Sequence, residues 1–226
     1  MIFILNIDTA SENGHVSIAK DGIVLNTFSN ESQKDHASFL QIAIQQLMAS
    51  ASISLKNIDA IAVTAGPGSY TGLRVGMASA KGLCYALKKP FITISTLEVL
   101  TASALQLFPT DSKDLFYCPM MDARRMEVFT AIYKYDLTVQ LQPCAMILDE
   151  SSFEKELLKN KIVFFGSGSV KWSSICKNSN AVFKAVSILP GSMSKLSNSL
   201  FSEKKFTDLA YSEPLYLKEF QTVIKS

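Results

Sequence analysis

Short apolar runs separated by turn-forming residues dominate the start of the chain. The runs at residues 2–8 and 13–19 are rich in β-branched side chains and are split by Ser11-Glu12-Asn13-Gly14, which has turn composition. A third run, residues 23–28, follows Asp21-Gly22. Because short turns join these runs, the pattern predicts three strands in an antiparallel meander.

Apolar residues at helical spacing then alternate with further short runs. Residues 35–48, 70–87 and 97–107 show the helical pattern, with Pro90 and Pro109 stopping the last two helices. The runs at 58–64 and 91–95 are typical of buried strands. The predicted order is β-β-β-α-β-α-β-α, which is the ribonuclease-H-like unit of actin, sugar kinases and many nucleases.

A second, shorter series of elements follows a polar loop after Pro109. Its pattern predicts strands at 116–121, 127–133 and 162–165 and helices at 150–158 and 170–176. We therefore predict an α/β, two-lobed actin-like and ribonuclease-H-like fold, of the type found in sugar kinases, Hsp70 and actin.

We place the boundary between the predicted lobes near Phe108. The N-terminal lobe spans residues 1–108, and a smaller, degenerate C-terminal lobe spans residues 109–226. The tail, residues 209–226, either caps the second lobe or packs back on the first.

Composition narrows the classes of function. The chain has 226 residues, of which 48% are hydrophobic, and this is enough to form a core without metal or disulfide support. Its cysteines lie far apart and its two histidines have no ligand-like spacing to them, which argues against a zinc site. Cys84 and Cys118 fall within apolar patterns, so we expect both to be core residues of a protein in the reducing cytoplasm.

Neither a membrane nor a nucleic acid is an obvious direct partner. No apolar stretch reaches the roughly 18 residues that a membrane span needs, and the first residues read as a strand and not as a signal peptide. The net charge is +2, and the basic residues are scattered, with arginine only at positions 74, 124 and 125. If RNA is involved, we expect another subunit to hold it.

The first predicted strand ends in a possible phosphate-binding turn. Asp8, Thr9 and Ser11 occupy the position from which actin-like ATPases direct a carboxylate and backbone amides at nucleotide phosphates. The same residue types also cap ordinary turns at strand ends, so that alternative stays open. A nuclease reading is weak, because the acid of the fourth strand, Asp59, lies at the wrong end of it.

Two glycine-containing turns offer further candidates. Gly66, Gly68 and Ser69 lie between a strand and a helix, where they either bind an anion or make a tight, well-capped turn, and the latter is favoured. Gly166 and Gly168 stand similarly before the second predicted helix of the second lobe, although this match is weak. In addition, a stripe of small residues at positions 72, 76 and 80 lets either the protein's own sheet or a partner helix approach closely.

Several of these segments together resemble the TsaB (YeaZ) family. They are Ile7-Asp8-Thr9-Ala10, the string from Ile61 to Gly76 with its Gly-Pro-Gly-Ser-Tyr-Thr-Gly-Leu-Arg core, Ala80-Lys81-Gly82-Leu83, Ser95-Thr96-Leu97-Glu98 and Met121-Asp122-Ala123-Arg124. Beyond about residue 130, only Phe165-Gly166-Ser167-Gly168 and the segment from Pro214 to Lys218 match. Lys218 stands where the family pattern has arginine.

The resemblance implies an actin-like fold and a non-catalytic role, without a cofactor. A TsaB protein is required for threonylcarbamoylation of the adenosine next to the anticodon in tRNAs, as the obligate partner of its catalytic paralogue TsaD, with the ATPase TsaE as third component. It would meet tRNA only through the complex. TsaD binds its metal with a His-x-x-x-His pair, and alignment places Thr96 and Leu100 at those positions.

The resemblance also implies that the helices at 35–48 and 70–87 form the partner interface. It further implies that the same surface forms a homodimer when the partner is missing. The expected contacts are His36, Phe39, Leu40, Tyr70, Leu73, Arg74 and Met77. Two alternatives remain. One is a stand-alone ATPase or kinase-like enzyme that uses the glycine turns. The other, a peptidase, is disfavoured because the chain has neither a Gly-x-Ser-x-Gly elbow nor a His-Glu-x-x-His helix.

Overall fold

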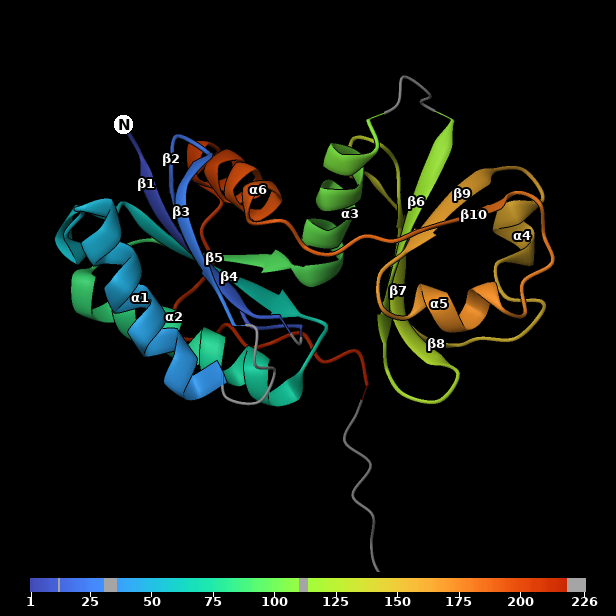
Figure 1. Cartoon of the computed structure of the whole chain (residues 1–226), viewed down its shortest axis with the longest axis horizontal. Helices are drawn as coiled ribbons and strands as arrows, with labels where there is room; N and C mark the ends of the chain where they lie inside the picture. Colours follow the sequence, from blue (N-terminus) through green and yellow to red (C-terminus); the bar gives the residue numbers. More distant parts are fainter. Residues whose placement is uncertain (12, 31–35, 110–113, 219–226) are drawn as a thin grey trace, which may run out of the picture.

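The computed structural model describes residues 1–11, 13–30, 36–109 and 114–218. The chain forms two lobes side by side, each built on a five-stranded mixed sheet (Figure 1). Helix α3 (Thr96–Leu107) lies between the two lobes.

The first lobe is a mixed sheet with helices on both faces. Its strands run in the order β3-β2-β1-β4-β5. Their bounds are Phe3–Asp8 for β1, His15–Lys20 for β2, Ile23–Ser29 for β3, Ala60–Gly66 for β4 and Phe91–Ser95 for β5. The first three strands form the predicted antiparallel meander, and β4 and β5 add in parallel.

Side chains of β1 alternate between two cores. Leu5 and Ile7 pack with α1 (His36–Ala51) and α2 (Tyr70–Leu87) on one face, whereas Ile4 packs with α6 (Pro190–Ser202) on the other. A short 3-10 helix, η1 (Leu55–Asn57), precedes β4. Because both faces of the sheet are covered, its central strands read as continuous apolar runs.

The second lobe is smaller and has an aromatic core. Its sheet order is β10-β9-β6-β7-β8. The bounds are Leu115–Asp122 for β6, Glu127–Tyr133 for β7, Val139–Ile147 for β8, Lys161–Phe165 for β9 and Ala181–Lys184 for β10. The buried indole of Trp172, on α5 (Ser169–Ser173), packs edge-on against Phe153 and Phe164, next to α4 (Glu154–Leu157).

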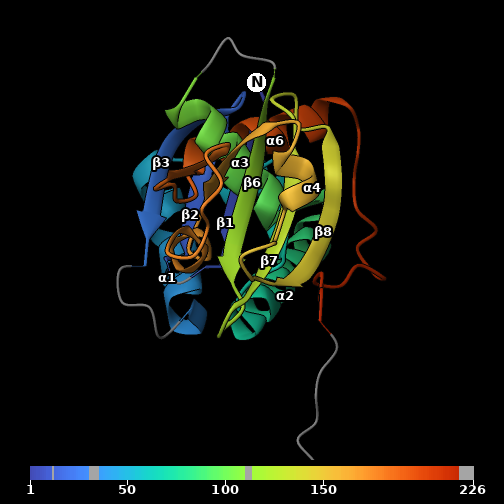
Figure 2. The same cartoon turned by 90° about the vertical axis from the view of Figure 1, so that its right-hand side faces the viewer.

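Four elements escaped the sequence pattern: the short helix η1, strands β8 and β10, and helix α6. Strand β8 contains Pro143 and lies at the sheet edge, where only one side needs to be apolar (Figure 2). Helix α6 buries Ser192, Ser194 and Ser197, so its inner face reads as polar. Helices α4 and α5 are also shorter than the predicted ranges 150–158 and 170–176.

The chain returns to the first lobe after β10. Helix α6, which falls within the range predicted for the second lobe, packs on the first sheet because its Met193 completes the core around Ile4. The described part of the tail stays there: Thr207 N–H donates to Phe91 O at 2.8 Å and Leu215 N–H to Ala65 O at 2.6 Å. Residues 219–226 of the predicted tail lie outside the described residues.

The cysteines are all free, and Cys84 and Cys118 are buried as predicted. Burial raises the pKa of the Cys84 thiol to about 12 and also raises that of Cys118. Within the described ranges, no helix combines the length and the apolar character that a bilayer crossing requires.

The raised pKa values predict selective thiol chemistry. At pH 8 in the folded protein, Cys84 and Cys118 should resist an alkylating reagent, because the reactive thiolate is scarce and the sulfur is shielded. After unfolding in guanidinium, both should react. Peptide mass spectrometry checks this, and modification of Cys84 in the folded protein at the rate of the half-buried Cys176 would show that the core is open.

Candidate functional site

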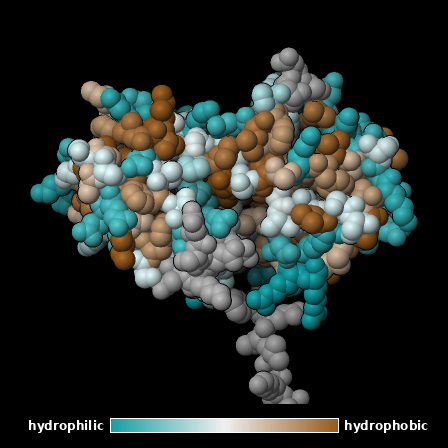
Figure 3. All heavy atoms as spheres, in the orientation of Figure 1, coloured by the Kyte–Doolittle hydropathy of each residue, from teal (hydrophilic) through white to brown (hydrophobic). Residues whose placement is uncertain are grey.

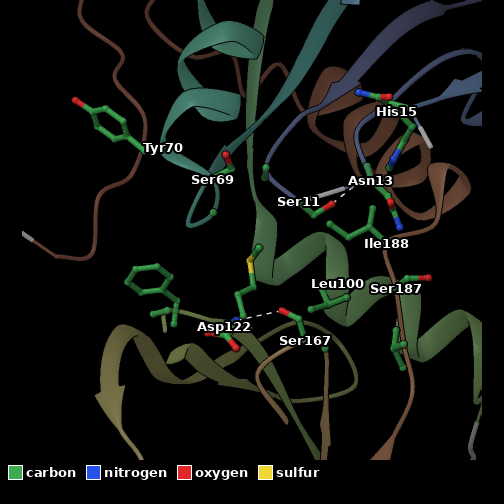
Figure 4. Close-up of a pocket in the computed structure, with 18 of the residues that line it drawn as sticks. Ser11, Asn13, His15, Ser69, Tyr70, Leu100, Asp122, Ser167, Ser187 and Ile188 are labelled. Carbon is green, nitrogen blue, oxygen red and sulfur yellow. Dashed lines mark hydrogen bonds between the residues drawn. The ribbon is translucent and has the colours of Figure 1, made fainter. Parts of the chain in front are cut away.

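A cleft of about 1040 Å³ separates the two lobes. Figure 4 shows Ser11, Asn13 and Ser69 on the side of the first lobe, facing Asp122 and Ser167 on the second. Apolar side chains gather where the lobes meet (Figure 3). Those that line the cleft include Leu100, Met121, Phe129, Val186 and Ile188.

Asp8 lies buried behind the cleft wall and is already engaged. Its Oδ1 accepts hydrogen bonds from Thr64 Oγ1 at 2.7 Å and from the Ala10 N–H at 3.0 Å. Its Oδ2 lies 3.7 Å from His15 Nδ1, and both side chains are almost fully buried. Asp8 is not among the residues that line the cleft, and its Oδ1 holds the turn together, whereas its buried Oδ2 has no hydrogen-bond partner among the described residues.

Two amides at the start of α2 already have partners within the chain. Ser69 N–H donates to Ala10 O at 2.7 Å, and the Ser69 hydroxyl accepts from Gly72 N–H as the helix N-cap. Thr9 Oγ1 in turn donates to Gly72 O at 2.7 Å. The amide of Ser69 is therefore not available to a phosphate.

The glycines of the predicted phosphate loops mostly allow close approach of the protein's own chain. A Cβ on Gly68 would collide with Ala10 O. Gly66 has φ +110° and lies against Leu215 O of the tail, and Gly166 has φ +93° and lies against Met120 O. Gly168 is buried beside Val128. Of the candidate phosphate-site residues, those that line the cleft are Ser11, Gly68, Ser69 and Gly166.

The charge of the cleft suits a polyphosphate poorly. Among the described residues that line it, Arg124 is the one cation, and Asp122 stands nearby as an anion. Lys171 is engaged by Asp122 and by the carbonyls of Arg125 and Glu127. The described ranges also contain no group of three His, Cys, Asp or Glu side chains placed to hold a metal ion.

The two positions that the resemblance aligns with metal-binding histidines lie one helical turn apart at the start of α3. Thr96 begins α3 and is fully buried, and Leu100 lies one turn later and lines the cleft. The hydroxyl-bearing side chain of Thr96 and the hydrocarbon side chain of Leu100 therefore occupy these two positions.

The predicted interface residues divide into buried and accessible ones. Leu40, Leu73 and Met77 are core residues of the folded chain. Phe39 and Tyr70 are partly buried, and Arg74 is exposed. His36 is the first residue of α1, and its side chain lies outside the described residues.

The small-residue stripe of α2 packs inward. Added Cβ atoms on Gly72 and Gly76 would collide with Thr9 O and Thr9 Oγ1, respectively, and Ala80 is fully buried. Of the two readings of the stripe, the protein's own sheet is therefore the correct one, because the turn after β1 occupies the groove.

The outer faces of α1 and α2 carry apolar residues that the prediction missed. Ile42 is 55% exposed and Tyr85 is 81% exposed. Gln41 Nε2 donates to Ser79 Oγ at 3.2 Å and joins the two helices. Ile42 and Tyr85 lie on the side of their helices opposite the core-facing positions. This placement is the one sequence signal that marks them as exposed apolar residues.

Comparison with known proteins relates the chain to one family. The model of the family described as TsaD, tRNA N6-adenosine threonylcarbamoyltransferase, matches residues 23–212. A protein of Escherichia coli K12, named tRNA threonylcarbamoyladenosine biosynthesis protein TsaB, is 29% identical over 222 residues, covering 95% of this chain and 94% of that protein. A tRNA N6-adenosine threonylcarbamoyltransferase of Bartonella bacilliformis is 51% identical over 63 residues, only 28% of this chain and 17% of that enzyme.

A solved structure supports the fold. A Pseudomonas aeruginosa protein, described as similar to the peptidase YeaZ, superposes with a TM-score of 0.83 at 21% identity, over 96% of this chain and all of that one. The predicted two-lobed, actin-like fold class is confirmed.

The packing of α2 predicts opposite effects for two glycine-to-alanine substitutions in one helix. Gly72→Ala should lower the free energy of unfolding by about 3 kcal/mol, because its Cβ meets the Thr9 carbonyl. Gly82→Ala should raise it by about 0.5–1 kcal/mol, because its Cβ meets nothing and alanine favours the helix. Urea titration of both variants checks this, and equal effects would contradict the described contact.

Proposed function

Since this chain belongs to the tRNA N6-adenosine threonylcarbamoyltransferase family and, within it, to the TsaB (YeaZ) group, we propose that it is a non-catalytic subunit of tRNA threonylcarbamoyladenosine biosynthesis. It binds the catalytic paralogue TsaD and activates it to modify the adenosine next to the anticodon. TsaE is the third component, and the chain meets tRNA through this complex.

The observation that carries this proposal is the chemistry at the start of α3. The catalytic paralogue needs two imidazole nitrogens there, and this chain offers Thr96 and Leu100. Leucine has no lone pair for a metal, and the threonine hydroxyl is a poor substitute for an imidazole. Likeness to TsaB over nearly the whole chain supports the same conclusion.

The first lobe supplies a surface suited to a partner. Helix α1 contains neither Asp, Glu, Lys nor Arg over its 16 residues, although one face of it is exposed. Together with α2 it presents Ile42 and Tyr85 around small residues such as Ala78 and Gly82. Depletion of charge and enrichment of large apolar and aromatic side chains are typical of the core of a protein interface.

A stand-alone ATPase or kinase-like enzyme is the second candidate, because the interlobe cleft is large enough for a nucleotide. Its weakness is that Asp8 and the Ser69 amide already have partners within the protein. Among the described residues that line the cleft, Arg124 is the one cation that could balance the phosphate charge.

The proposed interface predicts that one substitution on α2 weakens binding. Ala78→Arg adds a long charged side chain at an exposed position on the same face of α2 as Tyr85, and arginine is a good helix former. We expect the affinity for TsaD to fall at least tenfold, about 1.4 kcal/mol, measured by titration calorimetry.

Val170→Arg is the matched control, because it places the same side chain on an exposed site of the second lobe. It should bind TsaD like the unchanged protein. Equal binding by both variants would place the interface elsewhere, and failure of the unchanged chain to bind TsaD would overturn the proposal.

The engaged state of Asp8 and Ser69 predicts weak nucleotide binding. The isolated chain should show no saturable binding of ATP with magnesium below about 1 mM, which corresponds to about −4 kcal/mol. Equilibrium dialysis with radiolabelled ATP checks this. Micromolar binding that disappears in Asp8→Asn would favour the enzyme instead.

A further inference from the structure

A second pocket lies on the second lobe, away from the interlobe cleft. Its volume is about 540 Å³, and it opens where β6 and β9 begin and β7 ends. Because β6 pairs with both β9 and β7, these three strand ends meet at one edge of the second sheet. The cleft lies at the opposite edge, beside Asp122 at the end of β6 and Ser167 just after β9.

Three lysines converge on this pocket. Lys161 is the first residue of β9, Lys159 lies two residues before it, and Lys134 directly follows β7. Lys159 and Lys161 are exposed, and Lys134 is half-buried. None of the three ammonium groups forms an ion pair or a hydrogen bond with the residues that the structure describes. The described lysine ion pairs belong to Lys171, Lys177, Lys205 and Lys218.

The neighbouring acids leave the pocket positively charged. Asp114 is the one carboxylate among its described lining residues. Asp136 lies two residues beyond Lys134, but it does not line the pocket and its Oδ1 accepts a hydrogen bond from Thr138 N–H at 3.0 Å. Glu154, on the nearby α4, lines a different hollow. Three lysines against one aspartate therefore leave two uncompensated positive charges.

We infer that this lysine pocket, formed by Lys134, Lys159 and Lys161, binds the phosphate backbone of the tRNA in the complex with TsaD, an inference that rests on the proposed function. Lysine binds phosphate as a flexible point charge, and each contact releases counterions from the RNA. Such contacts position the RNA without reading its sequence. Another subunit still holds the tRNA, and this lobe adds a contact to its backbone.

The composition of the pocket favours RNA over a protein as the occupant. Lysine is depleted at protein–protein interfaces, where aromatic residues and arginine are enriched. The described lining of this pocket has three lysines and no arginine. A second copy of this chain is disfavoured as well, because a twofold contact would bring the same positive patch of both copies together. A free phosphate ion offers the same chemistry as the RNA backbone, and the test separates the two.

The lysine pocket stays open in the proposed complex. In Figures 1 and 2 the start of β6 lies at the end of the molecule opposite α1 and α2. These two helices are the proposed binding surface for TsaD. A partner docked on their outer faces therefore leaves the lysine pocket accessible to tRNA.

The test measures tRNA binding by the complex of TsaD with the full-length chain. The variant carries Lys134→Gln, Lys159→Gln and Lys161→Gln together. We expect the affinity for fluorescently labelled tRNA, measured by anisotropy, to fall at least tenfold, with unchanged affinity for TsaD by calorimetry. The slope of log K against log [KCl] should also become shallower by about 2 to 3, because three phosphate contacts are lost.

A matched control removes the same charge from the first lobe and α6. It replaces by glutamine two exposed lysines and one half-buried lysine that have no described ion pair, namely Lys195, Lys204 and Lys20. Its tRNA affinity should change less than twofold. A footprint of the unchanged complex needs no substitution at all: tRNA should protect Lys159 and Lys161 from acetylation and leave Lys195 reactive, as read by peptide mass spectrometry.

Three results would overturn the inference. The first is unchanged tRNA affinity of the triple variant, or acetylation of Lys159 and Lys161 that tRNA does not slow. The second is loss of TsaD binding by the triple variant, which would make the pocket a contact for an acidic protein surface. The third is binding of pyrophosphate by the isolated chain that the triple variant loses while its tRNA affinity stays the same, which would show a site for small anions only.

Each of these results leaves the proposed function standing, because the unchanged chain still binds TsaD. Failure of the unchanged chain to bind TsaD would overturn the proposed function and this inference together.

Discussion

The contact between the turn after β1 and the first turn of α2 holds the first lobe together. Thr9 and Ala10 present backbone carbonyls and a hydroxyl directly to α2, at a distance that only glycine at positions 68 and 72 permits. This contact fixes α2 against β1 and so determines which face of the helix points outward. It also engages the Ser69 amide, which is one of the groups that the sequence offers as a phosphate ligand.

The same contact bears on the proposed role as a binding subunit. The cleft is present, but the carboxylate behind it holds a turn, and Thr96 and Leu100 stand at the positions where the resemblance would place metal-binding histidines. Under the proposed function, the chain offers its partner the uncharged outer face of α1 and the neighbouring face of α2. A subunit that works by presenting this face on a rigid fold needs no catalytic group.

The sequence predicted elements well where local pattern and burial agree. Helix α2 has the predicted bounds 70–87, because its apolar stripe faces one core, Ser69 caps it and Lys88 ends it. Helix α6 was missed because small polar residues replace the apolar ones on its inner face. The return of the chain to the first lobe is a long-range packing effect that no local pattern contains.

For the candidate site, the sequence predicted where the glycine turns lie more accurately than what those turns do. Gly66, Gly68 and Gly166 do lie at the tight turns that their spacing suggested, yet what approaches them is the protein's own backbone. The resemblance names Leu40, Leu73 and Met77 among the expected partner contacts, whereas in the folded chain these side chains are buried.

The central claim is that this chain acts by binding a catalytic paralogue and performs no chemistry alone. The most direct measurement is threonylcarbamoylation of tRNA, with TsaE and substrates supplied, by TsaD alone, by this chain alone and by the two together. The account predicts modified tRNA only when both are present. Modification by this chain without TsaD, or full activity of TsaD without this chain, would contradict it.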